Sequence, residues 1–180
     1  MTYHLNGKHI QLRSLTKEDI PALIKHGNDP LLRKHLGANF PSPYDLPVAQ
    51  KWVEYVSKNE YGREEFGIFV DDQFVGCGGI ELGKGFELKN MHVGYRIGAD
   101  FRGKGYATDF LQTIVDYAFT KYDIHRIHSK VYSYNTASAR VMEKVGFQRE
   151  GVERQAICYQ GEYADAWSYG LLKSEWQERS

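Results

Sequence analysis

The sequence has few cysteines and no long apolar run. Cys77 and Cys158 are the only two cysteines among 180 residues, which excludes a disulfide framework and leaves no metal-ligand spacing. No apolar stretch approaches the roughly 20 residues that span a bilayer, and residues 1–6 lack the basic-then-apolar pattern of a signal peptide. We therefore expect a cytoplasmic protein without a bound metal and without membrane contact.

The sequence also lacks an excess of charge of either sign. Lys plus Arg and Asp plus Glu are both 23, so the net charge is zero. Proteins that bind nucleic acids usually carry a basic patch, and we expect no nucleic-acid partner here. Hydrophobic residues make up 42% of the chain, which is typical of a globular protein. The length predicts one domain spanning residues 1–180, with its core at about 9–176.

The hydrophobic periodicity switches between strand and helix patterns. Alternating segments predict strands at 9–13, 66–70, 74–82, 86–97 and 126–132, then a strand at 147–153 and a hairpin of 154–160 with 164–172. Three capped helices precede residue 60, and two more are predicted at 108–121 and 135–145. The pattern indicates an α/β fold: a mixed, partly antiparallel central sheet of about seven strands with helices on both faces.

A glycine-rich turn connects the strand ending at Ile97 to the helix predicted from Thr108. Its glycines, Gly103 and Gly105, allow positive φ and a close approach of backbone to ligand. The turn points several N–H groups at one spot beside the positive end of a helix dipole, which predicts a phosphate site. The spacing matches neither a Walker A loop nor a dinucleotide fingerprint. The glycines alone are equally compatible with a tight turn that has no ligand.

A second patterned segment, residues 135–147, strengthens the phosphate interpretation. Three positions of the turn match the R-x-x-G-x-A acetyl-CoA signature of the GNAT N-acetyltransferases: Arg102, Gly105 and Ala107. Residues 135–147 resemble the N-x-x-S…K-x-G-F helix of the same family, and residues 161–176 resemble the ending of its RimJ/RimL-type branch. The resemblance covers essentially the whole chain in order.

The resemblance implies that acetyl passes from acetyl-CoA directly to a primary amine in a ternary complex. The amine could belong to a protein N-terminus or to a small molecule, and the protein could be a monomer or a homodimer. The turn amides would hold the pyrophosphate, and the strand edge at 95–97 would pair with the pantetheine arm. The implied coenzyme contacts are Tyr95, Arg96, Ile97, Arg102, Gly103, Lys104, Gly105, Tyr106, Ala107, Asn135 and Ser138.

The proton acceptor is less well defined by the sequence. His92 stands where related proteins often have Glu, and a neutral His accepts protons near pH 7. Glu81, and Glu87 through a water, are alternatives. Ser138 is the candidate acid, because the tyrosine that many GNAT proteins place seven residues after the Asn is Met142 here.

Each of these residues also has a structural interpretation. His92 could be an ordinary sheet residue, and Asn135 could be a helix N-cap alone. Cys77, without an obvious base nearby, is expected in the core. The competing functional hypothesis is a non-catalytic acyl-CoA sensor of the same fold.

Overall fold

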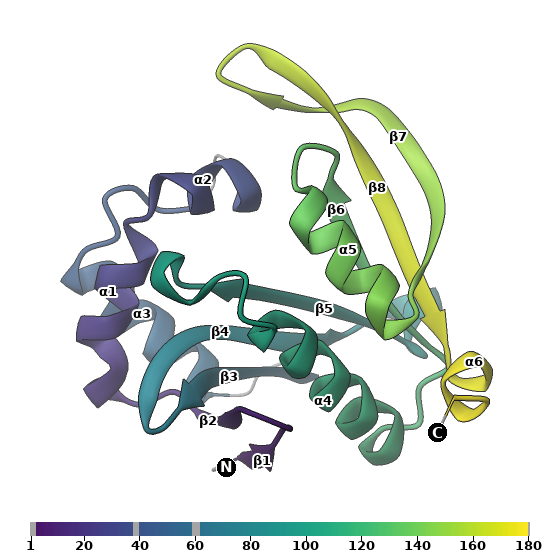
Figure 1. The fold of residues 1–180 in the computed structure, drawn as a ribbon, viewed down its shortest axis with the longest axis horizontal. Coiled ribbons are helices and arrows are strands. Elements are labelled where there is room, and N and C mark those ends of the chain that lie inside the picture. Colours follow the sequence, from purple (N-terminus) through teal and green to yellow (C-terminus); the bar gives the residue numbers. More distant parts are fainter. Residues whose placement is uncertain (1–2, 38–39, 59–61, 180) are drawn as a thin grey trace.

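A computed structural model describes residues 3–37, 40–58 and 62–179. Its centre is one eight-stranded sheet with the strand order β1-β2-β3-β4-β5-β6-β8-β7 (Figure 1). All neighbouring strands are antiparallel except β5 and β6. No helix of the described residues is both long enough and apolar enough to cross a membrane. The strands are β1 (His4–Asn6), β2 (Gln11–Ser14), β3 (Arg63–Val70), β4 (Gln73–Leu82), β5 (Asn90–Ile97), β6 (Arg126–Tyr132), β7 (Gln148–Tyr159) and β8 (Glu162–Leu172).

Helices cover both faces of the sheet, as predicted. The α-helices are α1 (Ile20–Gly27), α2 (Pro30–Leu36), α3 (Leu46–Ser57), α4 (Tyr106–Lys121), α5 (Thr136–Val145) and α6 (Lys173–Gln177), and the short 3-10 turns are η1 (Lys17–Asp19), η3 (Gly85–Glu87) and η4 (Ala99–Phe101). Buried residues of α4 and α5 form the larger core with one face of the sheet. Residues of α1 and α3 form a second core on the other face. The first face is called the α4 face below, and the second the α1–α3 face.

The structure departs from the predicted elements at both ends of the sheet. The chain forms an additional strand, β1, and a short last helix, α6. The segments predicted as separate strands at 147–153 and 154–160 are one strand, β7, whose register shifts between Glu153 and Ile157. Gln155 has a positive φ of 51° there. A bulge of this kind interrupts the alternation of side chains without ending the strand, which is why the pattern suggested two strands.

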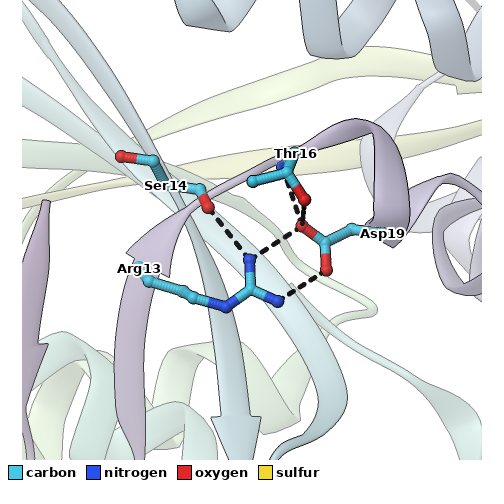
Figure 2. A network of polar contacts seen from close by, with 4 residues as sticks. All are labelled: Arg13, Ser14, Thr16 and Asp19. Atoms are coloured by element: carbon cyan, nitrogen blue, oxygen red, sulfur yellow. Dashed lines mark hydrogen bonds and ion pairs between the residues drawn. The ribbon is translucent and has the colours of Figure 1, made fainter. Parts of the chain in front are cut away.

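A polar network joins the end of β2 to the start of α1 (Figure 2). The guanidinium of Arg13 donates to both carboxylate oxygens of Asp19, at 2.8 and 2.9 Å. The Thr16 backbone N–H donates to the same carboxylate at 2.8 Å. Burial raises the pKa of Asp19, but the hydrogen bonds from Arg13 and Thr16 outweigh this effect, so its net pKa lies below the usual value. The network fixes α1 on the α1–α3 face.

This network makes a prediction about stability. Asp19→Asn should lower the free energy of unfolding at pH 7 by about 1–3 kcal/mol, because it removes charged hydrogen bonds from a buried site. The folded-state pKa is depressed, so the carboxylate stabilises the fold above its unfolded pKa of about 3.9 and loses that contribution as the pH falls through the folded pKa. The difference in free energy of unfolding between wild type and Asp19→Asn should therefore become smaller below about pH 4. Denaturant unfolding at pH 7, 4 and 3 measures it.

The control is Asp100→Asn, which removes an exposed ion pair with Lys25 at 3.6 Å. Exposed pairs contribute about 0–1 kcal/mol, so this variant should stay close to wild type. If the difference in free energy of unfolding between wild type and Asp19→Asn stays constant across the pH range, the depressed pKa assigned to Asp19 is contradicted.

A second buried carboxylate holds α4 against the sheet. Glu64 on β3 is 1% exposed and accepts hydrogen bonds from Tyr117, Tyr122 and Lys121. These donors come from the end of α4 and the residue after it. The network fixes the helix whose other end meets the glycine-rich turn.

Candidate active site

The strands β5 and β6 diverge in the middle of the sheet. Their parallel register joins only Asn90–His92 to Arg126–His128. Beyond that point β5 continues to pair with β4 as far as Ile97, while β6 pairs with β8 as far as Tyr132 (Figure 1). Among the described residues, the β5 edge from Val93 to Ile97 therefore has no strand partner on the β6 side. Five residues leave about 16 Å of free backbone edge.

The glycine-rich turn follows directly from this edge. Gly103 and Gly105 have φ of 77° and 87°, and Gly105 is the N-cap of α4. No atom lies within 4 Å of the position that a Cβ would take at either glycine. The glycines are therefore required by the backbone angle, and the space beside them is open. Tyr106 and Ala107 form the first turn of α4, whose N–H groups have no partner within the helix.

The charged side chains of the turn do not all face this space. Arg102 forms an ion pair with Asp29, the N-cap of α2, and its Nε donates to the Ile97 carbonyl at 3.2 Å. Arg102 thus ties the turn to α2, and the predicted phosphate grip by this side chain remains a hypothesis. The ammonium of Lys104 lies 5.4 Å from the centre of the Phe101 ring.

A second contact holds α2 from the other side of the gap. The hydroxyl of Tyr134, in the connection between β6 and α5, donates to the Lys34 carbonyl at 2.5 Å. Its ring stacks on His35 with centroids 6.0 Å apart. Because Arg102 and Tyr134 both bind α2, this short helix connects the two sides of the gap.

Three predicted site residues meet on the α4 face of the gap. Tyr95 packs against Phe110, and its hydroxyl lies 3.0 Å from Ser138 Oγ. Asn135 is the N-cap of α5, as the structural interpretation expects, and its side chain accepts from the Ser138 N–H at 3.3 Å. Burial raises the pKa of Tyr95 to about 12, so its hydroxyl stays protonated. A protonated hydroxyl can donate to Ser138 and leave the serine proton free to point into the gap.

The predicted proton acceptors lie on the α1–α3 face. His92 is opposite Glu81 on β4 and opposite His128 on β6, and the two histidine rings meet edge to face with centroids 5.6 Å apart. Desolvation lowers the pKa of His92, His128 lowers it further, and Glu81 opposes this. The imidazole is therefore neutral near pH 7. The Glu81 carboxylate accepts a hydrogen bond from Arg63 at 2.8 Å. Glu87 lies in η3 and acts electrostatically on His128.

Sequence reasoning missed His128 as a neighbour of His92. The alternation within 126–132 places it on one face of its strand, but the partner strand and the register are not written in that pattern. Only the folded sheet brings the two rings together.

The comparison with protein families now decides the identity of the fold. A family described as "Acetyltransferase (GNAT) domain" matches residues 9–148. The chain belongs to the GNAT acetyltransferase family. Its glycine-rich turn and the gap between β5 and β6 are therefore parts of a GNAT domain, and the predicted fold class is confirmed.

Relatives and solved structures agree with this GNAT assignment. The chain is 32% identical over 179 residues to the putative ribosomal N-acetyltransferase YdaF of Bacillus subtilis, with 95% of each chain covered. It is 30% identical to the spermidine N(1)-acetyltransferase of Vibrio cholerae over 97% of this chain and 99% of the relative. The solved structure of the RimL ribosomal L7/L12 alpha-N-protein acetyltransferase with coenzyme A shares the fold, with a TM-score of 0.84 at 22% identity over 96% and 99% of the two chains.

Proposed function

We propose that this protein is an acetyl-CoA-dependent N-acetyltransferase that transfers acetyl directly to a primary amine in a ternary complex. The observation that carries the proposal is the unpaired β5 edge, which starts beside His92 and ends at the open turn before α4. A peptide-like pantetheine arm needs such an edge, and a pyrophosphate needs such a helix N-terminus. The likeness to YdaF and the ending of the chain support a place in the RimJ/RimL-type branch.

Each group then has a task in the transfer. The amides from Arg102 to Ala107 hold the pyrophosphate, and the edge at 95–97 orients the thioester and donates to its carbonyl oxygen as negative charge develops there. Ser138 donates a hydrogen bond to the departing thiolate. His92 accepts the proton of the attacking ammonium, because it is neutral and does not share its proton site with a salt bridge. Glu81 is the weaker candidate, since Arg63 already holds its carboxylate.

A covalent acetyl-enzyme is not part of this proposal. Cys77 is 1% exposed, and burial raises the pKa of its thiol to about 12. A thiol with that pKa is almost entirely protonated at neutral pH and is a poor nucleophile.

Two measurements test the proposed function. Calorimetry with acetyl-CoA measures binding to the folded protein, and a thiol assay over a panel of primary amines measures transfer. We expect binding together with thiol release that depends on the amine. Absence of acetyl-CoA binding would contradict the proposed function. Binding without thiol release from any amine would favour the non-catalytic acyl-CoA sensor.

The contact between Tyr95 and Ser138 makes a separate prediction. Tyr95→Phe keeps the ring that packs on Phe110 but removes the hydroxyl that shares a hydrogen bond with Ser138. One neutral hydrogen bond contributes about 0.5–1.5 kcal/mol, so kcat should fall about two- to tenfold while KM for the amine stays near wild type. Steady-state kinetics measures both constants. If Tyr95 acts through Ser138, adding it to Ser138→Ala should cause no further loss, and additive losses would contradict this coupling.

A further inference from the structure

Two long-range contacts hold α2, which lies between the C-terminal ends of β5 and β6 (Figure 1). At the start of the helix, Asp29 forms an ion pair with Arg102 of the glycine-rich turn. In its second half, the Lys34 carbonyl accepts a hydrogen bond from the Tyr134 hydroxyl at 2.5 Å. Tyr134 directly precedes Asn135 in the chain. Both attachments of α2 therefore belong to segments that the proposed coenzyme would contact.

The far end of α2 lies on the α1–α3 face, which is also the face of the proposed base. A Cβ placed on Gly37, the residue after α2, would lie 3.4 Å from the Tyr132 hydroxyl. Tyr132 and His128 are four residues apart on β6 and therefore share one face of the strand. The His128 ring in turn meets that of His92. The helix thus stands on the side of the sheet from which an acceptor amine would approach His92.

The ion pair between Asp29 and Arg102 is the contact that can transmit coenzyme binding to α2. The two side chains are only 14% and 33% exposed, so water and salt screen this pair less than a pair on the surface. The Nε of Arg102 also donates to the Ile97 carbonyl at 3.2 Å, at the end of the free β5 edge. The other oxygen of the Asp29 carboxylate accepts from the Leu31 N–H at 3.0 Å as the N-cap of α2. One carboxylate therefore connects the first turn of α2 to the coenzyme strand and turn.

We infer that Asp29 is a positioning residue that couples the coenzyme site to the acceptor site through α2. The inference rests on the proposed function and adds a residue to it. Acetyl-CoA fixes the turn and the β5 edge, and with them Arg102, which then holds Asp29 and the start of α2 in place. Because α2 loses its conformational freedom when the coenzyme binds, the acceptor has less of that freedom to remove. Each ligand therefore raises the affinity for the other by the same factor.

Hydrogen exchange with acetyl-CoA as the probe tests this coupling. In wild type, acetyl-CoA should slow amide exchange in the turn at 98–107 and also in α2 at 31–36. In Asp29→Asn it should slow exchange in the turn only. Asn is as good an N-cap as Asp, so this variant removes the charge and keeps the start of the helix. The matched control is Asp45→Asn at the N-cap of α3, where the side chain accepts from the Val48 N–H at 3.1 Å, and α2 should respond there as in wild type.

The exchange data separate this inference from the proposed function. Equal slowing of α2 exchange in wild type and Asp29→Asn would overturn the inference. A wild-type turn that becomes protected while α2 does not would overturn it as well. Both outcomes leave the proposed function in place, because acetyl-CoA still binds at the turn. A wild-type turn that acetyl-CoA does not protect would instead contradict the proposed coenzyme site.

Steady-state kinetics gives an independent measurement at the acceptor. With saturating acetyl-CoA and the best amine of the panel, Asp29→Asn should raise KM for the amine about fivefold or more, the lower end of typical coupling between two sites. The kcat should stay near wild type, because Asp29 acts through Arg102 and not on the reacting atoms. A purely structural Asp29 would lower the amount of active enzyme, and therefore kcat, without changing KM.

Arg102→Gln distinguishes this coupling from a direct grip on phosphate. If the ion pair couples the two sites, Arg102→Gln should raise KM for the amine as Asp29→Asn does, and the double variant should raise it no further. If the guanidinium instead leaves Asp29 to bind the pyrophosphate, Arg102→Gln should weaken acetyl-CoA binding about tenfold or more. Asp29→Asn should then strengthen that binding, because it removes the competing carboxylate. Calorimetry that shows this second pattern would overturn the inference.

Discussion

Gly105→Trp should lower the affinity for acetyl-CoA about 100-fold or more, because several charged hydrogen bonds at about 1.5–3 kcal/mol each depend on this turn. Gly105 has a φ of 87°, and nothing lies within 4 Å of its Cβ position. A Cβ placed there meets no neighbour, and we expect the indole to extend into the open space at the start of α4. The variant therefore removes the ligand's space and leaves the core untouched. Calorimetric titration with acetyl-CoA measures the loss.

The chain offers a matched control for the strain of this substitution. Gly161, in the turn between β7 and β8, has a φ of 84° and is also free of neighbours within 4 Å. A side chain at such an angle costs about 1–2 kcal/mol of stability. Gly105→Trp and the control Gly161→Trp should therefore unfold at similarly reduced denaturant concentrations. Only Gly105→Trp should have a reduced affinity for acetyl-CoA. Equal affinities for the two variants would refute the assignment of the turn.

The local elements were largely predictable because their signals are short-range. The strand expected at 126–132 has the same bounds in the structure, and Asp29 and Asp45 cap α2 and α3 as their sequence contexts predict. Gly146 ends α5 with a φ of 101°. The helix predicted from Thr108 begins two residues earlier, at Tyr106. Its N-cap is a glycine in the left-handed conformation, and such a residue carries no capping side chain for the sequence to reveal.

The arrangement of the site was only partly predictable, because its contacts join residues far apart in the chain. Alternation along a strand predicts that His92 and Arg96 share one face and that Tyr95 lies on the other, as the structure has it. It could not show that Tyr95 hydrogen-bonds with Ser138, 43 residues away, or that Arg102 forms an ion pair with Asp29, 73 residues away. A local pattern specifies which face a side chain occupies. Its partner depends on strand register and helix packing, which form only in the complete fold.

His92→Gln should reduce kcat/KM about 100-fold or more near pH 7, the usual contribution of a general base. The loss should shrink as the pH approaches the pKa of the acceptor amine, because the amine then arrives already deprotonated. In wild type the rate should fall as the pH drops through the pKa of His92, which lies below its ordinary value of about 6.5. This acid limb of the pH–rate profile should be absent in His92→Gln. Steady-state kinetics between pH 5 and 9 measures it.

Variants of the neighbours of His92 distinguish a general base from a purely structural residue, because these neighbours shift the pKa of His92 in opposite directions. His128 and Arg63 lower that pKa and Glu81 raises it. His128→Gln should therefore move the acid limb to higher pH, and Glu81→Gln should move it to lower pH. A merely structural His92 leaves the limb in place in both variants. If the limb persists in His92→Gln and vanishes in Glu81→Gln, Glu81 is the base, and the imidazole serves only to pack against its neighbours on the sheet.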